Sequence, residues 1–87
     1  VEPAAWRERL AGVDAVVNCA GILREAGGDT FERVHRTVPL ALAKATAAAG
    51  LTRFVQVSAL GDPADGAFVA SKHAADAELL ALDGLAV

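Results

Sequence analysis

The stretch from Arg53 to Lys72, RFVQVSALGDPADGAFVASK, decides the fold. It begins with a short apolar run that ends at Ser58, continues through a loop rich in Gly, Asp and Pro, and enters an amphipathic segment that carries Lys72. This order predicts a strand, a loop and a helix. Ligands of open parallel sheets bind outside the carboxyl ends of the strands, so Ser58 occupies a position where chemistry is expected.

The helix that follows the loop is predicted from about Ala67 to Leu82, and its apolar residues share one face. The residues on this face recur at spacings of four and three: Phe68, Lys72, Ala75, Leu79 and Leu82. Lys72 is therefore expected to face the sheet, whereas His73 and Asp76 are expected to point elsewhere. Two interpretations of Lys72 stay open: its stem covers apolar surface, or its ammonium reaches the crevice beyond Ser58.

The upstream sequence predicts a short helix over residues 3–11 and a strand over Val13–Asn18. The strand is continuously apolar from Ala15 to Val17, a pattern that predicts burial on both faces. Asp29 and Glu32 have the spacing of a capping box at the start of a long amphipathic helix. Pro39 is expected to kink or split that helix near residues 36–38.

Gly50 is predicted to end this long helix, and a second buried strand then runs from Arg53 to Ser58. A strand, a helix and a strand in this order predict a parallel pair joined by a crossover. Leu85–Val87 begins a further apolar run at the end of the sequence, which predicts the start of a third strand. The expected fold class is therefore α/β, in a sequence that we expect to be an internal piece of a larger protein.

Composition excludes several classes of function. The 87 residues amount to one domain at most, 54% of them are hydrophobic and 5% aromatic, so the core must consist of small side chains. The net charge of -3 provides no basic stripe, so nucleic acid is not an expected partner. No apolar run is long enough for a membrane span, and a single cysteine, Cys19, fits a reducing cytoplasm.

The segment Asn18-Cys19-Ala20-Gly21 closes the first strand. It is equally compatible with an ordinary turn and with a floor of small residues on which a flat ligand lies. Cys19 is expected to be a small buried side chain rather than a nucleophile, and His35 a solvated or core-edge histidine without a partner. Ser58 has the alternative role of capping a backbone group. The sequence allows no metal cluster or nucleophile triad to be assembled.

Four motifs in order, VDAVVNCAG, FERVH, AGLTRFVQVSALG and FVASK, resemble the middle of a short-chain dehydrogenase/reductase. The resemblance is to the extended or atypical branch, which includes epimerase-like and NAD(P)H-binding proteins, and it covers nearly the whole chain. It implies the second half of a Rossmann-type, doubly wound parallel sheet over residues 1–87. The glycine-rich turn that grips the pyrophosphate has no counterpart in this sequence, so binding of NAD or NADP by these residues alone is expected to be weak or absent.

The resemblance also implies residue roles. Asn18, Cys19, Ala20 and Gly21 would lie beside the adenosine part of the cofactor, Ser58 near a small-molecule substrate, and Lys72 on the nicotinamide ribose. In the family the lysine also lowers the pKa of a catalytic tyrosine four residues earlier. That position is Phe68 here, and His35 stands where the family often has asparagine.

Three hypotheses follow. The first is an NAD(P)-dependent oxidoreductase or epimerase-like enzyme that transfers hydride at the nicotinamide, with the proton supplied by a group other than residue 68. The second is a non-catalytic NAD(P)H-binding subunit or redox-sensing regulator of the same fold. The third is an α/β packing module whose resemblance is topological only. The direction of the Lys72 ammonium separates the third hypothesis from the others, because a lysine that points into bulk water fits only a packing module.

Overall fold

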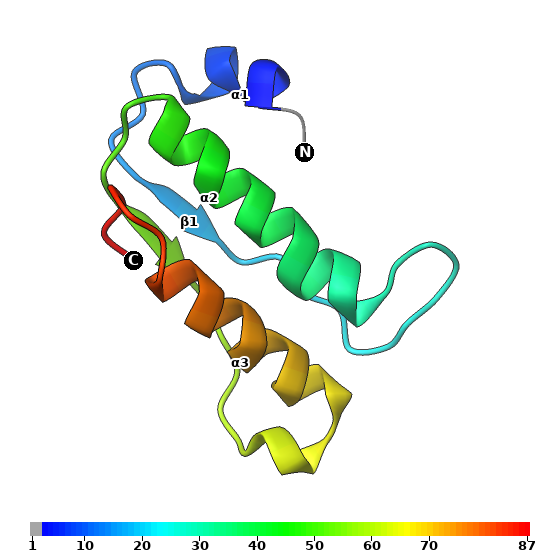
Figure 1. Ribbon diagram of the computed structural model, residues 1–87. Helices are drawn as coiled ribbons and strands as arrows, with labels where there is room; N and C mark the ends of the chain where they lie inside the picture. The colour runs from blue at the N-terminus through cyan, green and yellow to red at the C-terminus, as the bar shows by residue number, and fades with distance from the viewer. Residues whose placement is uncertain (1–2) are drawn as a thin grey trace.

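Two parallel strands and three α-helices make up the part of the chain that the computed structural model describes, residues 3–87, with the backbone alone described for residues 3–5, 7 and 63. The elements follow one another as α1 (Pro3–Leu10), β1 (Val16–Asn18), the π-helix η1 (Glu32–Thr37), α2 (Val38–Ala48), β2 (Phe54–Gln56), the 3-10 helix η2 (Pro63–Asp65) and α3 (Ala67–Leu80) (Figure 1). The predicted α/β class and the order of its elements are confirmed, although both strands are shorter than predicted.

The two strands pair in parallel. Val16 is opposite Phe54, and the register continues to Asn18 opposite Gln56. The last residues extend this arrangement, because the amide of Phe54 donates to the carbonyl of Ala86 at 2.8 Å and Arg53 and Ala86 form a parallel bridge. The predicted third strand therefore begins beside β2, on the edge opposite β1.

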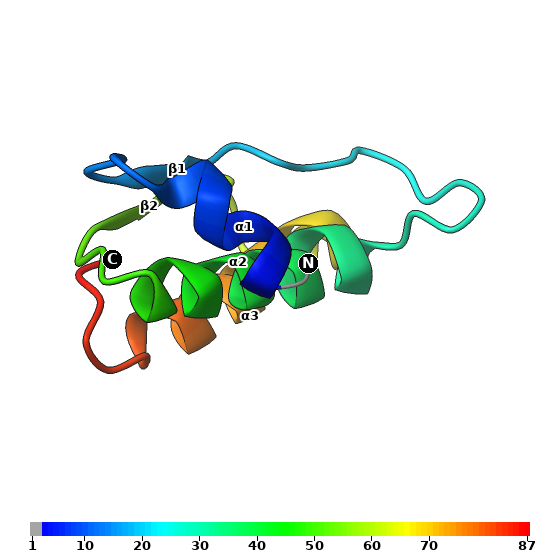
Figure 2. The same ribbon diagram turned by 90° about the horizontal axis from the view of Figure 1, so that it is seen from above.

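The helices α2 and α3 cover one face of the sheet (Figure 2). Phe54 points into this layer, is 1% exposed, and packs with Ala43 of α2 and Leu79 of α3. The predicted burial on both faces is wrong, because Val17 and Val55 point to the other side and are 57% and 44% exposed. Successive residues of a strand alternate between faces, so a continuous apolar run says nothing about whether both faces are covered.

The long helix changes type rather than breaking at Pro39. Proline has no N–H, and its ring collides with the carbonyl four residues earlier in an α-helix. The wider π-turn of η1 lies immediately before the proline, and the amide of Val38 bonds the carbonyl of Arg33, five residues back. The disturbance predicted over residues 36–38 thus takes the form of a π-helix that begins earlier, at Glu32.

The two ends of this helix have identifiable caps. The predicted capping box of Asp29 and Glu32 is wrong, because the hydroxyl of Thr30 accepts from the amide of Arg33 at 3.1 Å. At the other end Gly50 adopts a φ of 86°, and the amides of Gly50 and Leu51 bond the carbonyls of Ala47 and Thr46. This is a Schellman motif, so the predicted end at Gly50 is confirmed.

A search of the described residues for a helix long and apolar enough to cross a membrane finds none.

The packing of Leu79 yields a stability prediction. We expect Leu79→Ala to lower the free energy of unfolding by about 3 kcal/mol, because it leaves a cavity beneath Phe54. Leu80→Ala is the matched control on the same helix: Leu80 is 67% exposed, and its loss should change stability by less than about 0.5 kcal/mol. Urea unfolding measures both values, and equal losses for the two variants would contradict this core.

Candidate functional site

The ammonium of Lys72 lies between the carboxyl ends of the two strands. It donates to the carbonyl of Val57 at 2.9 Å and to the carbonyl of Ala20 at 3.4 Å, and the residue is 4% exposed. Both carbonyls belong to residues just beyond the strands. The predicted sheet-facing position of Lys72 is therefore confirmed, and its ammonium lies between the two strand ends and not in bulk water.

The segment after β1 combines a structural turn with exposed small residues. The Oδ1 atom of Asn18 accepts from the amide of Ala20 at 3.3 Å, and its Nδ2 atom donates to Oε1 of Gln56 at 2.7 Å. Asn18 is buried and shapes this turn, as one of the two predicted alternatives requires. Ala20 and Gly21 are exposed, and so is Cys19, which corrects the expectation that this cysteine is buried.

Gly21 lies next to two polar side chains of the site, those of His35 and Lys72. A Cβ atom at this position would stand 3.5 Å from Nε2 of His35 and 3.7 Å from Nζ of Lys72, both ordinary contact distances. The backbone of Gly21 lies outside the left-handed region. A methyl group would therefore fit there and would cover both polar atoms.

Ser58 is exposed at the end of β2, and its hydroxyl donates to Oδ2 of Asp76 on α3. His73, on the same helix, donates from Nε2 to the carbonyl of Ala59 at 2.7 Å. The expectation that His73 and Asp76 point away from the sheet is therefore wrong. A residue one turn from Lys72 can reach the β2 loop because that loop runs alongside the first turns of α3.

A hollow of about 300 Å³ opens next to Ser58, along the edge of β2 that faces residues 85–87. Its lining includes Gln56 and Asp76. The Nε2 atom of Gln56 and the Oδ1 atom of Asp76 are buried without a hydrogen-bond partner in the described part of the chain. Lys72 lies on the other side of β2, between the two strands, so Ser58 and Lys72 flank the same strand end without contacting each other.

His35 is fully buried, which corrects the expectation of a solvated or core-edge histidine without a partner. Its Nε2 atom lies 3.0 Å from the amide of Ile22, and its Nδ1 atom lies 2.8 Å from the hydroxyl of Ser71. The hydroxyl hydrogen of Ser71 is directed at the carbonyl of Phe68, at 3.0 Å. Ser71 therefore accepts from Nδ1–H, Nε2 accepts from Ile22, and the ring is neutral with its proton on Nδ1.

The environment of His35 disfavours a positive charge. Burial lowers its pKa below the ordinary 6.5, and the ammonium of Lys72 lowers this pKa further. Phe31 stacks on the imidazole at a centroid distance of 5.4 Å, and Phe68 meets it edge-on at 5.3 Å. These apolar rings occupy the space around His35 that water would otherwise fill.

Phe68 lies one turn before Lys72, as the sequence predicts, and is half-buried. Its ring has no hydroxyl, so the side chain cannot donate or accept a proton at this position. The nearest ionisable ring is His35, whose pKa is lowered by burial and by the Lys72 ammonium. The residues brought together are thus Lys72, His35, Phe68 and the strand end at Ala20 and Gly21.

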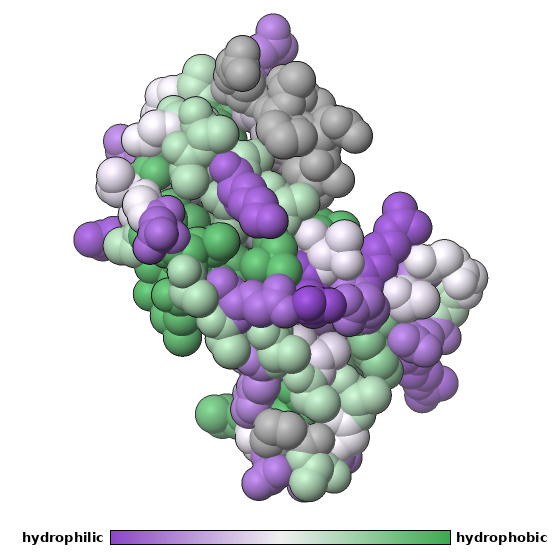
Figure 3. Space-filling view, in the orientation of Figure 1, coloured by the Kyte–Doolittle hydropathy of each residue, from purple (hydrophilic) through white to green (hydrophobic). Residues whose placement is uncertain are grey.

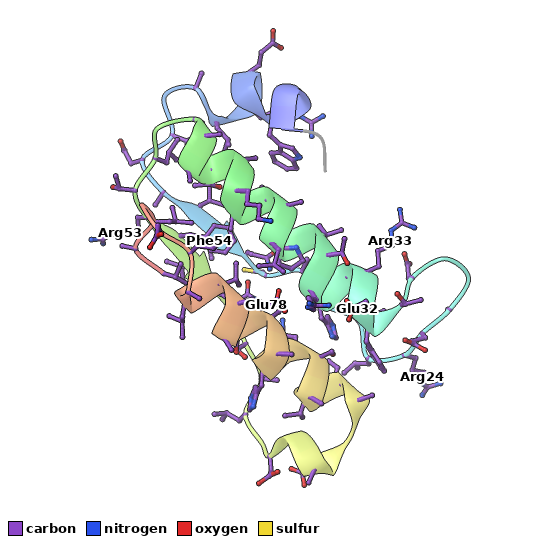
Figure 4. All side chains as sticks on the ribbon, viewed as in Figure 1. Arg24, Glu32, Arg33, Arg53, Phe54 and Glu78 are labelled. Carbon is purple, nitrogen blue, oxygen red and sulfur yellow. The ribbon has the colours of Figure 1, made fainter. Side chains whose placement is uncertain are left out.

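An ion-pair network joins the π-helix to α3 beside the site. Arg36 donates from Nε to Oε1 of Glu78 at 2.7 Å and also pairs with Glu32, and these bonds raise the pKa of its guanidinium. Figure 4 shows Glu32 and Glu78 between the two helices, and hydrophilic residues cross the middle of the same face in Figure 3. Exposed pairs of this kind contribute little energy each.

Sequence reasoning missed Ser71, Ile22 and Asp76 as contributors to the site. Their partners lie 13 to 36 residues away along the chain, and only the serine spacing in FVASK hints at one of them. Among the side chains that the structure describes, no group of three His, Cys, Asp or Glu residues is placed to hold a metal ion.

A scan against models of known protein families finds no match, and a search of curated proteins finds no similar sequence.

The neutral state of His35 predicts a pH dependence of stability. Below pH 6.5 the unfolded chain takes up a proton at His35 that the folded chain resists, so the free energy of unfolding should fall as the pH decreases, by at most about 1.4 kcal/mol per pH unit. Above pH 6.5 this residue contributes no slope. Urea unfolding between pH 7.5 and 5.5 measures this slope. The range lies on either side of the unperturbed histidine pKa of about 6.5. His35→Gln should flatten the slope while His73→Gln retains it, and an unchanged slope in His35→Gln would contradict the assignment.

Proposed function

We propose that this chain is the second half of a Rossmann-type domain that binds NAD or NADP, in a protein of the short-chain dehydrogenase/reductase type. One observation carries the proposal: the ammonium of Lys72 lies between the ends of two adjacent parallel strands. Ligands of open α/β sheets bind outside the carboxyl ends of the strands, and this general rule supports the proposed position of the nucleotide. The chain holds no G-x-x-G-x-x-G sequence, so the proposal assigns the pyrophosphate contacts to residues that precede Val1 in the intact protein.

In this proposal the exposed segment from Cys19 to Gly21 lies against the flat face of the nucleotide. Its small side chains allow close approach of a ligand to the backbone. Lys72 has three N–H donors, and within the described part of the chain two of them bond the carbonyls of Ala20 and Val57. In the proposal, the third donates to a ribose hydroxyl.

The apolar surroundings of Phe68 favour the non-catalytic form of this function, an NAD(P)H-binding subunit or redox-sensing regulator. Hydride transfer to a carbonyl needs a group that delivers a proton beside the nicotinamide. Phe68 has none, His35 has its proton committed to Ser71, and the hydroxyl of Ser58 is committed to Asp76. The second candidate, an NAD(P)-dependent oxidoreductase or epimerase-like enzyme, would use a proton donor outside these residues.

Dinucleotide binding tests the proposal. In the intact protein, Lys72→Met should weaken the binding of NADH or NADPH at least about tenfold, because a charge-assisted hydrogen bond is worth about 1.5–3 kcal/mol. Lys44→Met, at an exposed position on α2, is the matched control and should bind as tightly as the natural protein. Titration calorimetry measures the three affinities, and equal affinities for all three proteins would overturn the proposed site.

A second variant separates lost binding from lost folding. Gly21→Ala introduces a methyl group at van der Waals distance from Lys72 and His35 without backbone strain, so the fold should persist while the methyl covers the ammonium. We expect weaker dinucleotide binding and an unchanged free energy of unfolding to within about 0.5 kcal/mol. Gly28→Ala, in the loop remote from Lys72, is the matched control and should alter neither quantity.

Phe68→Tyr distinguishes the two candidate functions. A tyrosine hydroxyl here would stand one helical turn from the Lys72 ammonium, which lowers a phenol pKa from about 10. For the non-catalytic form we expect the natural protein not to oxidise NADH or NADPH with butane-2,3-dione as acceptor, whereas Phe68→Tyr gains a measurable rate. Equal oxidation rates in the two proteins would favour the enzyme.

A further inference from the structure

His35 connects three parts of the molecule: the loop after β1, the π-helix and α3. The Nε2 atom accepts from the amide of Ile22 in the loop after β1, and the Nδ1 atom donates to Ser71 on α3. The ring itself belongs to the π-helix, immediately before the turn that accommodates Pro39. The side chain is 0% exposed, so neither hydrogen bond can be exchanged readily for one with water.

The hydrogen bond to Ile22 exists only while Nε2 is unprotonated, because an amide can only donate. Protonation of His35 replaces this attraction with two N–H groups that face each other. The loop would then lose the one side-chain hydrogen bond that ties Ile22 to the helices in the described part of the chain. Ala20, two residues away, would keep its 3.4 Å bond to the Lys72 ammonium and the bond of its amide to Asn18.

One charged group near the imidazole, the ammonium of Lys72, opposes its protonation. From α3, Lys72 presents its ammonium, and a second cation in the same buried space is repelled. Asp76 of α3 lies one turn further on and is bonded to Ser58. On the π-helix, Glu32 and Arg36 are paired with each other, and Arg36 also pairs with Glu78. Residues 19–22 of the β1 loop contain no charged side chain.

We propose that His35 is a pH-responsive positioning residue: its neutral form holds the loop at residues 19–22 against Lys72, and its protonated form releases that loop. The inference rests on the proposed function for its consequence, because the loop it holds is the one assigned to the nucleotide. Acidification would then weaken dinucleotide binding by moving Ala20 and Gly21, without any change in the ligand itself. The loop movement is a property of the protein alone.

The loop movement is tested first, in the intact protein without cofactor. The ¹⁵N resonances of His35 should show the tautomer with its proton on Nδ1 at pH 7.5. The protection of the Ile22 amide against hydrogen exchange, corrected for the intrinsic pH dependence of exchange, should fall below pH 6.5 by up to about tenfold per pH unit. A proton on Nε2 at pH 7.5, or constant protection of Ile22 as His35 titrates, would overturn the proposal.

Two variants keep this test decisive. His35→Gln should abolish the pH dependence of Ile22 protection, whereas His73→Gln, which alters the histidine of α3, should retain it. If His35→Gln does not fold, Ser71→Ala replaces it: the imidazole remains but loses the acceptor for Nδ1–H. Its tautomer should become mixed, and Ile22 should exchange faster at pH 7.5 as well. Unaltered exchange in Ser71→Ala would count against the positioning role.

The affinity for NADH and NADPH between pH 7.5 and 5.5 tests the consequence. Affinity should fall towards acid by up to about tenfold per pH unit in the natural protein and in His73→Gln, and should stay flat in a folded His35 variant. Affinity that is constant while the Ile22 amide loses protection would overturn the link to the nucleotide. Absence of dinucleotide binding at every pH would overturn the proposed function, and the exchange data would still decide whether His35 holds the loop.

Discussion

The parallel pairing of β1 and β2 determines what the rest of the structure can do. Because the strands run in the same direction, both carboxyl ends stop at one edge of the sheet, and their last carbonyls point into the same small volume. Carbonyl oxygens that lie close together attract a cation. The Lys72 ammonium donates to the carbonyls of both Ala20 and Val57. An antiparallel pair would place these two carbonyls at opposite edges of the sheet, where no single side chain reaches both.

The composition makes this arrangement possible. Ala43 and Ala75 are fully buried in the helices that cover the sheet, so α2 and α3 approach the strands closely. A close approach brings Lys72, only one turn into α3, within reach of both strand ends. The same approach buries His35 completely and leaves Phe54 and Leu79 as the large side chains of the core. The site and the core are therefore two consequences of the same layer of small residues.

The sequence predicted the α/β class, the order of the elements, the sheet-facing position of Lys72 and the start of a third strand at residues 85–87. These features depend on local periodicity and on turn residues such as Gly50, which a sequence displays directly. The prediction that both faces of the first strand are buried was wrong at Val17. An apolar run shows the character of the side chains but not which elements cover them. Sequence reasoning also failed for His35 and Asp76, whose partners Ile22, Ser71 and Ser58 become neighbours only when the crossover closes.

The phenylalanine at position 68 and the neutral state of His35 are physically consistent with each other. A phenol beside Lys72 would bring a titrating hydroxyl and water into the space that Phe31 and Phe68 now fill around the imidazole. Better hydration would stabilise the charged ring and raise its pKa, and the hydrogen bond from Ile22 would then be lost at a higher pH. The apolar ring at position 68 thus removes a proton donor and at the same time protects the contact that holds the β1 loop. Both effects favour a site that holds the β1 loop in place over one that transfers protons.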